Sequence, residues 1–530
     1  MKNRIKQYLL AASMCVGLTA CSDFFEPIPG VQFGLDETFA SKQRTEEYLN
    51  NVYSYVREVT DAIHPNTYGG IFTEASLDGA NRWNKTYAEW TNGSFNSASA
   101  QASEYFSKYY QAIAKASTFI QNVDKCTEAA ASTRGKWKSE ARALRAYYYF
   151  ELLRLYGPIP LIGEDPIPLD ASLEELIKER NSVDECVNFI ATELQSAIDS
   201  GDLLQRAGKA NLGRMDVATC MALKAKLYLY WASPLFNGNT DQASVKNKDG
   251  KQLFPQTEDN SKWAQARDAY ERFMTFAAGQ GYKLTEVYTN GKLDPYASCR
   301  AAGEFFTTTW EAVDELIFVK LRDLYDYTYW VCPKFTDFQD TDVTGGGGYY
   351  TTQETVDLFF TKDGLTIEED PGYDKFEGIP SANNFTSGRY YDPNNPSRLY
   401  FDADKSKVLK QWKDREPRFY VNITYSGSIW LNEGKYNEEM RTDFTNGANG
   451  TCGKSKASGD CPDSGYLIRR GAKASNNNGS KHFSPVLRLA DMYLGYAEAL
   501  CMCSDLDNAL TYLNKIRVRA GIPEYTFTAT

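Results

Sequence analysis

Apolar residues recur at three- and four-residue spacing along much of the chain, and this period limits the possible folds more than any other feature. It places them on one face of an α-helix, where they can pack against a neighbouring element. After a first helix expected around residues 45–58, such stripes cover residues 106–123, 137–155, 183–197, 218–232, 263–277, 487–501 and 510–516. Ser182 and Glu185 form a capping-box sequence at the start of one stripe. The pattern predicts about eight amphipathic helices.

The predicted helices follow one another closely, which favours helix–turn–helix pairs. Small alanines alternate with large aromatic residues in the stripes, as in the nested pairs of tetratricopeptide (TPR) proteins. We therefore predict a mostly α-helical fold built from about four TPR-like helix pairs. A scaffold is expected over residues 41–277, with a final pair over residues 485–530.

Residues 278–484 lack the helical period and predict a loop-rich, aromatic insertion subdomain. Pro, Asn, Gly and Ser interrupt short β-like pieces such as residues 418–425. The four glycines over residues 345–348 are interpreted as a linker, because no phosphate-binding motif accompanies them. A long irregular segment inside a compact protein is usually functional or mobile.

The first residues of the chain have the pattern of a lipoprotein signal. A basic start, a short apolar run over residues 8–17 and small residues over 18–20 precede Cys21. We predict a signal peptide over residues 1–20, acyl chains such as palmitate on Cys21, and a tether over residues 21–40. Several acyl chains give stable anchoring, so the mature protein is expected on a membrane but not within it.

Composition bears on partners and chemistry. The net charge of −11 argues against nucleic acid as a partner, since phosphate backbones attract clustered Lys and Arg. Only His64 and His482 could act as histidine bases, and neither an HExxH nor a GxSxG motif occurs. One sequence leaves open a pair of carboxylates brought together in space. No cysteine–histidine grouping predicts zinc, and we expect no metal and no cofactor.

Two cysteines flank a loop rich in Gly, Ser and Lys. In an exported protein Cys452 and Cys461 could form a disulfide, so we mark them as a possible pair.

Several long segments resemble the SusD/RagB family of outer-membrane lipoproteins, in the order in which that family has them. They cover residues 140–162, 213–234, 356–370, 414–420 and 486–523. The resemblance implies four TPR-like helix pairs that support an irregular subdomain. It further implies a cell-surface protein of the outer membrane that binds oligosaccharides without catalysis and delivers them to a SusC-like, TonB-dependent transporter.

The chain departs from that family at its end. Members normally continue past the segment that corresponds to residues 517–523 into a further helix rich in Glu and Arg, whereas this chain stops at Thr530. If the end is truncated, the last helix pair loses a covering neighbour, and we expect lower stability.

Sugar binding requires an aromatic face for stacking and polar side chains for the hydroxyls. Residues 77–95 combine both, and the corresponding region of the family contributes to its glycan face. The leading candidates are Asp78, Arg82, Trp83, Asn84 and Trp90. A second group from the insertion comprises Tyr327, Tyr329, Trp330 and Trp430. Each tryptophan has packing in the core as its alternative, and this packing role is expected for Trp137, Trp231, Trp263 and Trp412.

We therefore predict a surface lipoprotein that captures glycans for uptake and is not an enzyme. Two alternatives remain at this point, a surface glycoside hydrolase or lyase and a TPR-type adaptor that binds only protein.

Overall fold

The computed structural model describes most of the chain after its first 33 residues. The described residues are 34–57, 76, 79–81, 93–163, 167, 171–303, 314–322, 329–335, 345–376, 378–431, 441–445, 452–453, 460–472 and 482–526. The predicted signal peptide and Cys21 lie outside them, as does His64.

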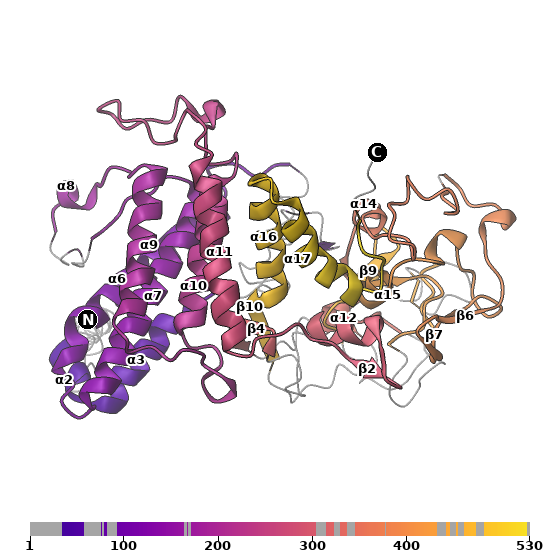
Figure 1. Cartoon of the computed structure of the whole chain (residues 1–530), viewed down its shortest axis with the longest axis horizontal. Helices are drawn as coiled ribbons and strands as arrows, with labels where there is room; N and C mark the ends of the chain where they lie inside the picture. The colour runs from indigo at the N-terminus through magenta and orange to yellow at the C-terminus, as the bar shows by residue number, and fades with distance from the viewer. Residues whose placement is uncertain are drawn as a thin grey trace, which may run out of the picture.

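All of the predicted helices are present. The long ones are α3 (Lys42–Ser54), α6 (Ala100–Asn122), α7 (Ala131–Tyr156), α9 (Val183–Asp199), α10 (Val217–Ala232), α11 (Ser261–Gly279), α16 (Leu489–Met502) and α17 (Leu506–Arg519). Two short helices, α2 (Leu35–Ala40) and α8 (Leu173–Leu176), accompany them. Helices α6, α7, α9, α10, α11, α16 and α17 pack one against the next in chain order (Figure 1). The prediction of a mostly α-helical fold of TPR-like pairs is confirmed.

The last pair belongs to the same core as the scaffold, although the insertion separates them in sequence. Gly495 of α16 lies directly against the hydroxyl of Tyr270 on α11, where a larger residue would not fit. The rings of Tyr270 and Tyr496 stack with their centroids 6.2 Å apart. Absence of a side chain at one position therefore lets the two helices approach closely.

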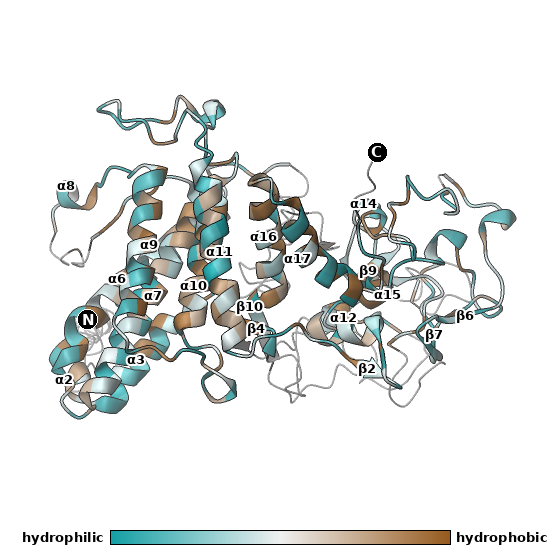
Figure 2. Cartoon of the chain, viewed as in Figure 1, coloured by the Kyte–Doolittle hydropathy of each residue, from teal (hydrophilic) through white to brown (hydrophobic). Residues whose placement is uncertain are grey.

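Helix α7 is buried around nearly its whole circumference, because α6 and α9 pack on it from different sides. A polar residue in such a helix needs a partner. Arg145, which is fully buried, donates to Glu193 of α9 at 2.5 and 2.8 Å and to Ser117 of α6 at 3.1 Å. In Figure 2 the apolar stretches lie mainly on the packed helices, α10 and α16 among them.

The insertion is built from short strands and turns. The strands are β1 (Ala80–Asn81), β2 (Tyr288–Thr289), β3 (Lys292–Leu293), β4 (Leu316–Arg322), β5 (Tyr349–Tyr350), β6 (Arg389–Asp392), β7 (Asn395–Asp402), β8 (Ile423–Tyr425), β9 (Tyr466–Ile468) and β10 (His482–Arg488). One sheet has the order β1-β5-β9-β8, and β2–β3, β6–β7 and β4–β10 are antiparallel pairs. The short helices of this region are α12 (Pro295–Gly303), α14 (Gln353–Asp357), α15 (Pro417–Asn422) and the 3₁₀ turn η7 (Lys410–Trp412).

The β-like assignment of residues 418–425 is only partly right. Residues up to Asn422 form helix α15, and only Ile423–Tyr425 form a strand. Pro417 occupies the start of the helix, a position that suits proline because its missing N–H has no helical partner there. The short segment offers too few residues for its period to reveal this turn.

The linker interpretation of the four glycines is wrong, because Gly345–Gly348 are buried. Gly346 lies against the ring of Trp330, and its N–H donates to the carbonyl of Tyr329 at 2.7 Å. Gly345 lies against the backbone of Tyr329 and the side chain of Cys332. The glycines are needed here for close approach of two chain segments, which a count of glycines cannot distinguish from flexibility.

Gly346→Ala is expected to lower the free energy of unfolding by about 1–3 kcal/mol, since the new methyl group would overlap the Trp330 ring. Chemical denaturation followed by circular dichroism measures the change. Gly279→Ala is the matched control, because a methyl group there meets open space within α11. Equal stability of the two variants would contradict the close packing.

The insertion joins the helical scaffold at the buried carboxylate of Glu315, just before β4. Arg519 of α17 donates to both carboxylate oxygens at 2.7 and 2.9 Å, and Arg488 contacts one of them at 3.3 Å. Burial alone would raise the pKa of Glu315, but the two guanidinium groups outweigh it and hold the pKa below its ordinary value. Arg519 is the closer partner, because it reaches both oxygens at shorter distances than Arg488 reaches one. Burial and the charge of Arg470 lower the pKa of Arg488 to about 10.

Glu315→Gln is expected to destabilise the protein by about 3–5 kcal/mol near neutral pH, because it leaves buried Arg519 without its counter-charge. A group with a lowered pKa in the folded state stabilises above its unfolded pKa, about 4.3 for Glu. The difference from the unsubstituted protein should therefore shrink as the pH falls below that value. Denaturation at several pH values measures this, with exposed Glu286→Gln as the control. A small, pH-independent difference would contradict the role of the charge.

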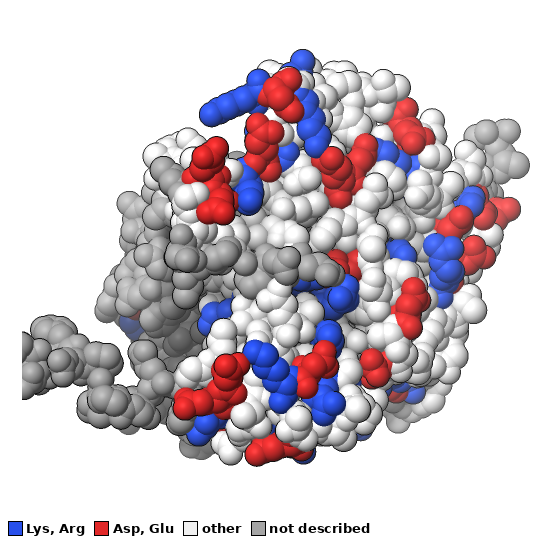
Figure 3. All heavy atoms as spheres, turned by 90° about the vertical axis from the view of Figure 1, so that its left-hand side faces the viewer, with Lys and Arg blue, Asp and Glu red and all other residues white. Residues whose placement is uncertain are grey.

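The outer face of the helical end carries mixed charge. On the described surface that Figure 3 turns to the viewer, acidic and basic side chains lie interspersed. Ion pairs of the described helical part include Lys125 with Asp36 at 2.8 Å and Lys138 with Asp124 at 2.6 Å. None of the helices in the described ranges combines the length and the hydrophobicity that a membrane span requires.

Candidate functional site

Most of the predicted glycan-binding residues lie outside the part of the chain that the structure describes. These are Asp78, Arg82, Trp83, Asn84, Trp90 and Tyr327. Their roles stay predictions. Tyr329, Trp330 and Trp430 are described, and so are Cys452 and Cys461.

Strand β1 lies at the edge of the insertion's sheet. Ala80 pairs with Tyr350, and Asn81 pairs with Tyr349, in an antiparallel register. The two strands are far apart in sequence. The described part of the loop that we predicted for glycan binding, residues 79–81, therefore meets the insertion at β5.

The same β5 segment also reaches the second group. The four glycines precede β5 directly, and three of their N–H groups donate to carbonyls of residues 329–333, at 2.7 Å for Tyr329 and 3.0 Å for Cys332 and Pro333. Tyr329 and Trp330 are half-buried, and their rings meet edge to face at 4.9 Å. Residues 345–350 thus contact both β1 and residues 329–333. We call β1, Tyr329 and Trp330 the candidate glycan surface.

Trp430 does not belong to this surface. It is 1% exposed and packs with Phe335 and Leu431 in a small core beneath Trp330. The Phe335 ring lies 6.4 Å away, and the guanidinium of Arg469 lies 5.7 Å from the Trp430 ring. Stacking on a sugar requires an open ring face. Its predicted binding role does not fit this placement, whereas Trp137, Trp231, Trp263 and Trp412 are buried as predicted.

Cys452 and Cys461 are both buried, at 1% and 5% exposure. Cys452 belongs to the same small core as Trp430 and Cys332. Burial, and then the proximity of Cys452, raise the pKa of the Cys332 thiol. The disulfide between Cys452 and Cys461 stays a prediction.

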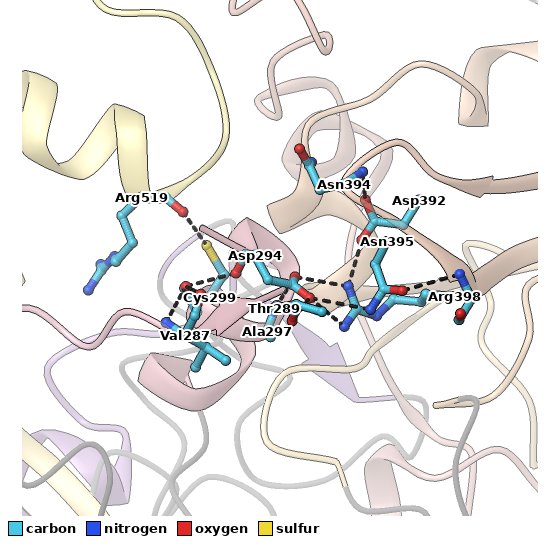
Figure 4. A network of polar contacts seen from close by, with 12 residues as sticks. Val287, Thr289, Asp294, Ala297, Cys299, Asp392, Asn394, Asn395, Arg398 and Arg519 are labelled. Carbon is cyan, nitrogen blue, oxygen red and sulfur yellow. Dashed lines mark hydrogen bonds and ion pairs between the residues drawn. The ribbon is translucent and has the colours of Figure 1, made fainter. Parts of the chain in front are cut away.

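Two buried carboxylates of the insertion bind the same arginine and are candidates for an acid–base pair. Asp294, at the start of α12, and Asp392, at the end of β6, are both buried around Arg398 of β7 (Figure 4). Arg398 donates to Asp294 at 2.9 and 3.0 Å and to Asp392 at 2.6 Å. Its guanidinium lies 4.2 Å from the Tyr296 ring centroid. The arrangement holds the β6–β7 hairpin against α12.

The electrostatics of this pair do not suit glycoside hydrolysis. A glycosidase needs one carboxylic acid whose pKa is raised, so that it stays protonated. Burial would raise the pKa of Asp294, but the hydrogen bonds from Arg398 and from the N–H of Ala297 outweigh it and lower the pKa. Both carboxylates are engaged by Arg398, so this pair acts as a structural clamp.

Two acidic residues of the segment 363–370 stabilise turns, namely Glu369 and Asp370. Thr366 and Glu369 exchange hydrogen bonds, with the Thr366 hydroxyl donating to the carboxylate at 2.9 Å. Asp370 accepts the N–H of Gly372 at 2.8 Å. Among the described residues, His, Cys, Asp and Glu form no group of three that could hold a metal ion.

Arg398→Met is expected to cost about 3–5 kcal/mol of stability, because it leaves two buried carboxylates without a counter-charge. Thermal denaturation measures the loss. The control, Arg267→Met, removes an exposed pair with Asp268 and is expected to cost less than about 1 kcal/mol. A change in Arg398→Met no larger than in the control would show that the clamp contributes little.

Two family models match most of the chain. Residues 315–530 match the model described as the SusD family, and residues 32–229 match the model described as "Starch-binding associating with outer membrane". A SusD-like protein from Bacteroides ovatus is 27% identical over 175 residues, which make up 32% of this chain and 30% of that protein. The match therefore spans less than a third of that relative.

Solved structures share the fold over nearly the whole chain. The structure of BT4246 superposes with a TM-score of 0.73 at 24% identity, covering 92% of this chain and 83% of the other. A SusD-like carbohydrate binding protein from Bacteroides fragilis superposes with a TM-score of 0.60 at 17% identity, covering 93% and 81%. At such identities the likeness shows a common architecture.

Proposed function

Because the chain belongs to the SusD/RagB family, we propose that it binds glycans at the outer membrane and delivers them for uptake without transforming them. The family description of starch binding in association with the outer membrane supports the ligand class and the location. The similar protein from Bacteroides fragilis is described as a carbohydrate binding protein, which agrees with this ligand class.

The observation that supports the proposal is that residues 345–350 contact two segments far apart in sequence. Strand β5 pairs with β1, which ends two residues before Trp83, and the glycines contact Tyr329 and Trp330. We propose that Trp83 and Trp90 contribute to the same surface as Tyr329 and Trp330. Sugar rings stack on aromatic faces while their hydroxyls bond polar side chains nearby. A surface assembled from a scaffold loop and the insertion can contact several sugars of one chain.

Delivery completes the proposed function. Acyl chains on Cys21 would hold the protein on the cell surface, where weak stacking raises the local concentration of an oligosaccharide. The helical face would dock a SusC-like, TonB-dependent transporter, and closure of the protein over it would pass the ligand on. Energy for transport would come from the transporter. Purification in mild detergent from natively expressing cells tests the partnership, and recovery without any transporter would contradict it.

Glycan binding is tested with the soluble chain that starts after Cys21, on a panel of plant, host and microbial glycans. We expect saturable binding, with Trp83→Ala, Trp90→Ala and Tyr329→Ala each weakening it by about tenfold, because each removes one stacking platform. Isothermal titration calorimetry measures the affinity. Tyr288→Ala is the matched control, since this tyrosine is 60% exposed on a different strand.

A reducing-sugar assay on the same panel separates the alternatives. Binding without product release supports capture, whereas product release would favour a surface hydrolase or lyase. Absence of both binding and release would favour the protein-binding adaptor.

A further inference from the structure

A cavity of about 630 Å³ opens in the insertion, and Tyr466 of β9 is among its lining residues. Its walls come from α14, from η7, from β9 and from the loops around residues 373–380 and 444–445. Neither Tyr329 nor Trp330 is among its described lining residues. Small-molecule sites usually have volumes of roughly 300–1,000 Å³, so the cavity has the size of a ligand site.

Aromatic rings form one part of the wall. Tyr373 and Phe376 are half-buried and line the cavity, so part of each ring is accessible. The Tyr373 hydroxyl is held in place, since it donates to the carbonyl of Gln411 at 2.7 Å and accepts from Arg415 at 2.7 Å. The ring is therefore fixed before any ligand arrives, which lowers the entropic cost of stacking.

A chain of hydrogen bonds forms the polar part of the wall. The Nε1 of Trp412 donates to the hydroxyl of Tyr466 at 3.1 Å, and that hydroxyl donates to the Oε1 of Gln353 at 2.9 Å. The Nε2 of Gln353 then donates to Asp357 at 2.7 Å. Each group donates to the next one in this series of hydrogen bonds, and the last acceptor is the Asp357 carboxylate, which lines the cavity. A carboxylate accepts several hydrogen bonds, and a ligand with hydroxyl groups would satisfy the remaining ones.

The charges near the cavity limit the ligand further. Asp357 would repel an acidic sugar, and Lys375 is already paired with Glu368 at 3.6 Å. The Tyr373 ring is held in a fixed position, and the Asp357 carboxylate can accept hydrogen bonds from hydroxyl groups. Among the described lining residues, the other charged group, Lys375, is paired with Glu368. These features suit a neutral carbohydrate.

We propose that this cavity is a second glycan site, separate from the candidate glycan surface, which takes the end or a short branch of a neutral oligosaccharide. The inference rests on the proposed function and deepens it. Two sites on one protein engage a long glycan at the same time, which raises the overall affinity without any new contact at either site.

The experiment titrates the soluble chain that starts after Cys21 with neutral trisaccharides, namely maltotriose, cellotriose, laminaritriose and mannotriose, each as a separate probe. Calorimetry should give two binding sites per chain for at least one of them. Phe376→Ala removes the exposed ring, and Asp357→Asn removes the charge while keeping an acceptor for Gln353. Both variants should weaken one site by about tenfold and leave the other unchanged.

Controls keep folding and binding apart. Phe106→Ala removes a phenylalanine on α6 that is 37% exposed and does not line the cavity, and it should leave both sites unchanged. Each variant is first checked for an unaltered melting temperature, and Asp357→Asn serves where Phe376→Ala does not fold.

The outcomes distinguish the two proposals. One site that responds to Trp90→Ala or Tyr329→Ala but not to the cavity variants would overturn the second site and keep the proposed function. Loss confined to the cavity variants would support the cavity and overturn the assignment of the candidate glycan surface. No binding of any trisaccharide, in a chain that also binds no glycan of the larger panel, would overturn both.

Discussion

The buried carboxylate of Glu315 is the interaction on which the rest of the architecture depends. It lies where the chain begins β4, and it is held by Arg519 from the last helix and by Arg488 at the end of β10. A buried charge of this kind is costly unless all of its partners are present. The start of the insertion, its return strand and the final helix pair therefore stabilise one another through this carboxylate, which ties a long irregular segment to a regular scaffold.

The Glu315 ion pairs hold only the start of the insertion and its return strand, so the rest of the insertion needs other contacts. Its sheet is short, so other close contacts stabilise it. These are the packing of the buried glycines over residues 345–348 and the ion pairs of Arg398 at the β6–β7 hairpin. Arg415 has a similar role, since it donates to the carbonyls of Val356 and Phe359. Polar groups that bind backbone hold loops in defined positions, and rigid loops can present a binding surface.

The helical part was predictable because its information is local. A stripe such as residues 106–123 specifies a helix within a few turns, and the Ser182–Glu185 capping box marks a helix start that the structure reproduces. The candidate glycan surface was not predictable in the same way. It depends on Ala80 pairing with Tyr350 and on a glycine run that packs against Trp330, and both contacts join segments whose own sequences show no period. Trp430 looked like its neighbours in sequence, and only its partners in space show that it is core.

The helical scaffold and the insertion use their side chains differently, which indicates different roles. In the scaffold, nearly every apolar side chain of α7 is buried by packing against other helices. Arg145 and Arg154 of α7 form ion pairs with Glu193 and Glu151. The insertion has few long elements that could bury its aromatic residues, so some rings such as Tyr329, Phe376 and Tyr373 remain partly accessible. Stacking needs rings that are held firmly yet not covered, and loops fixed by backbone hydrogen bonds meet both conditions. Ligand recognition is therefore expected in the insertion and at its junction with the scaffold.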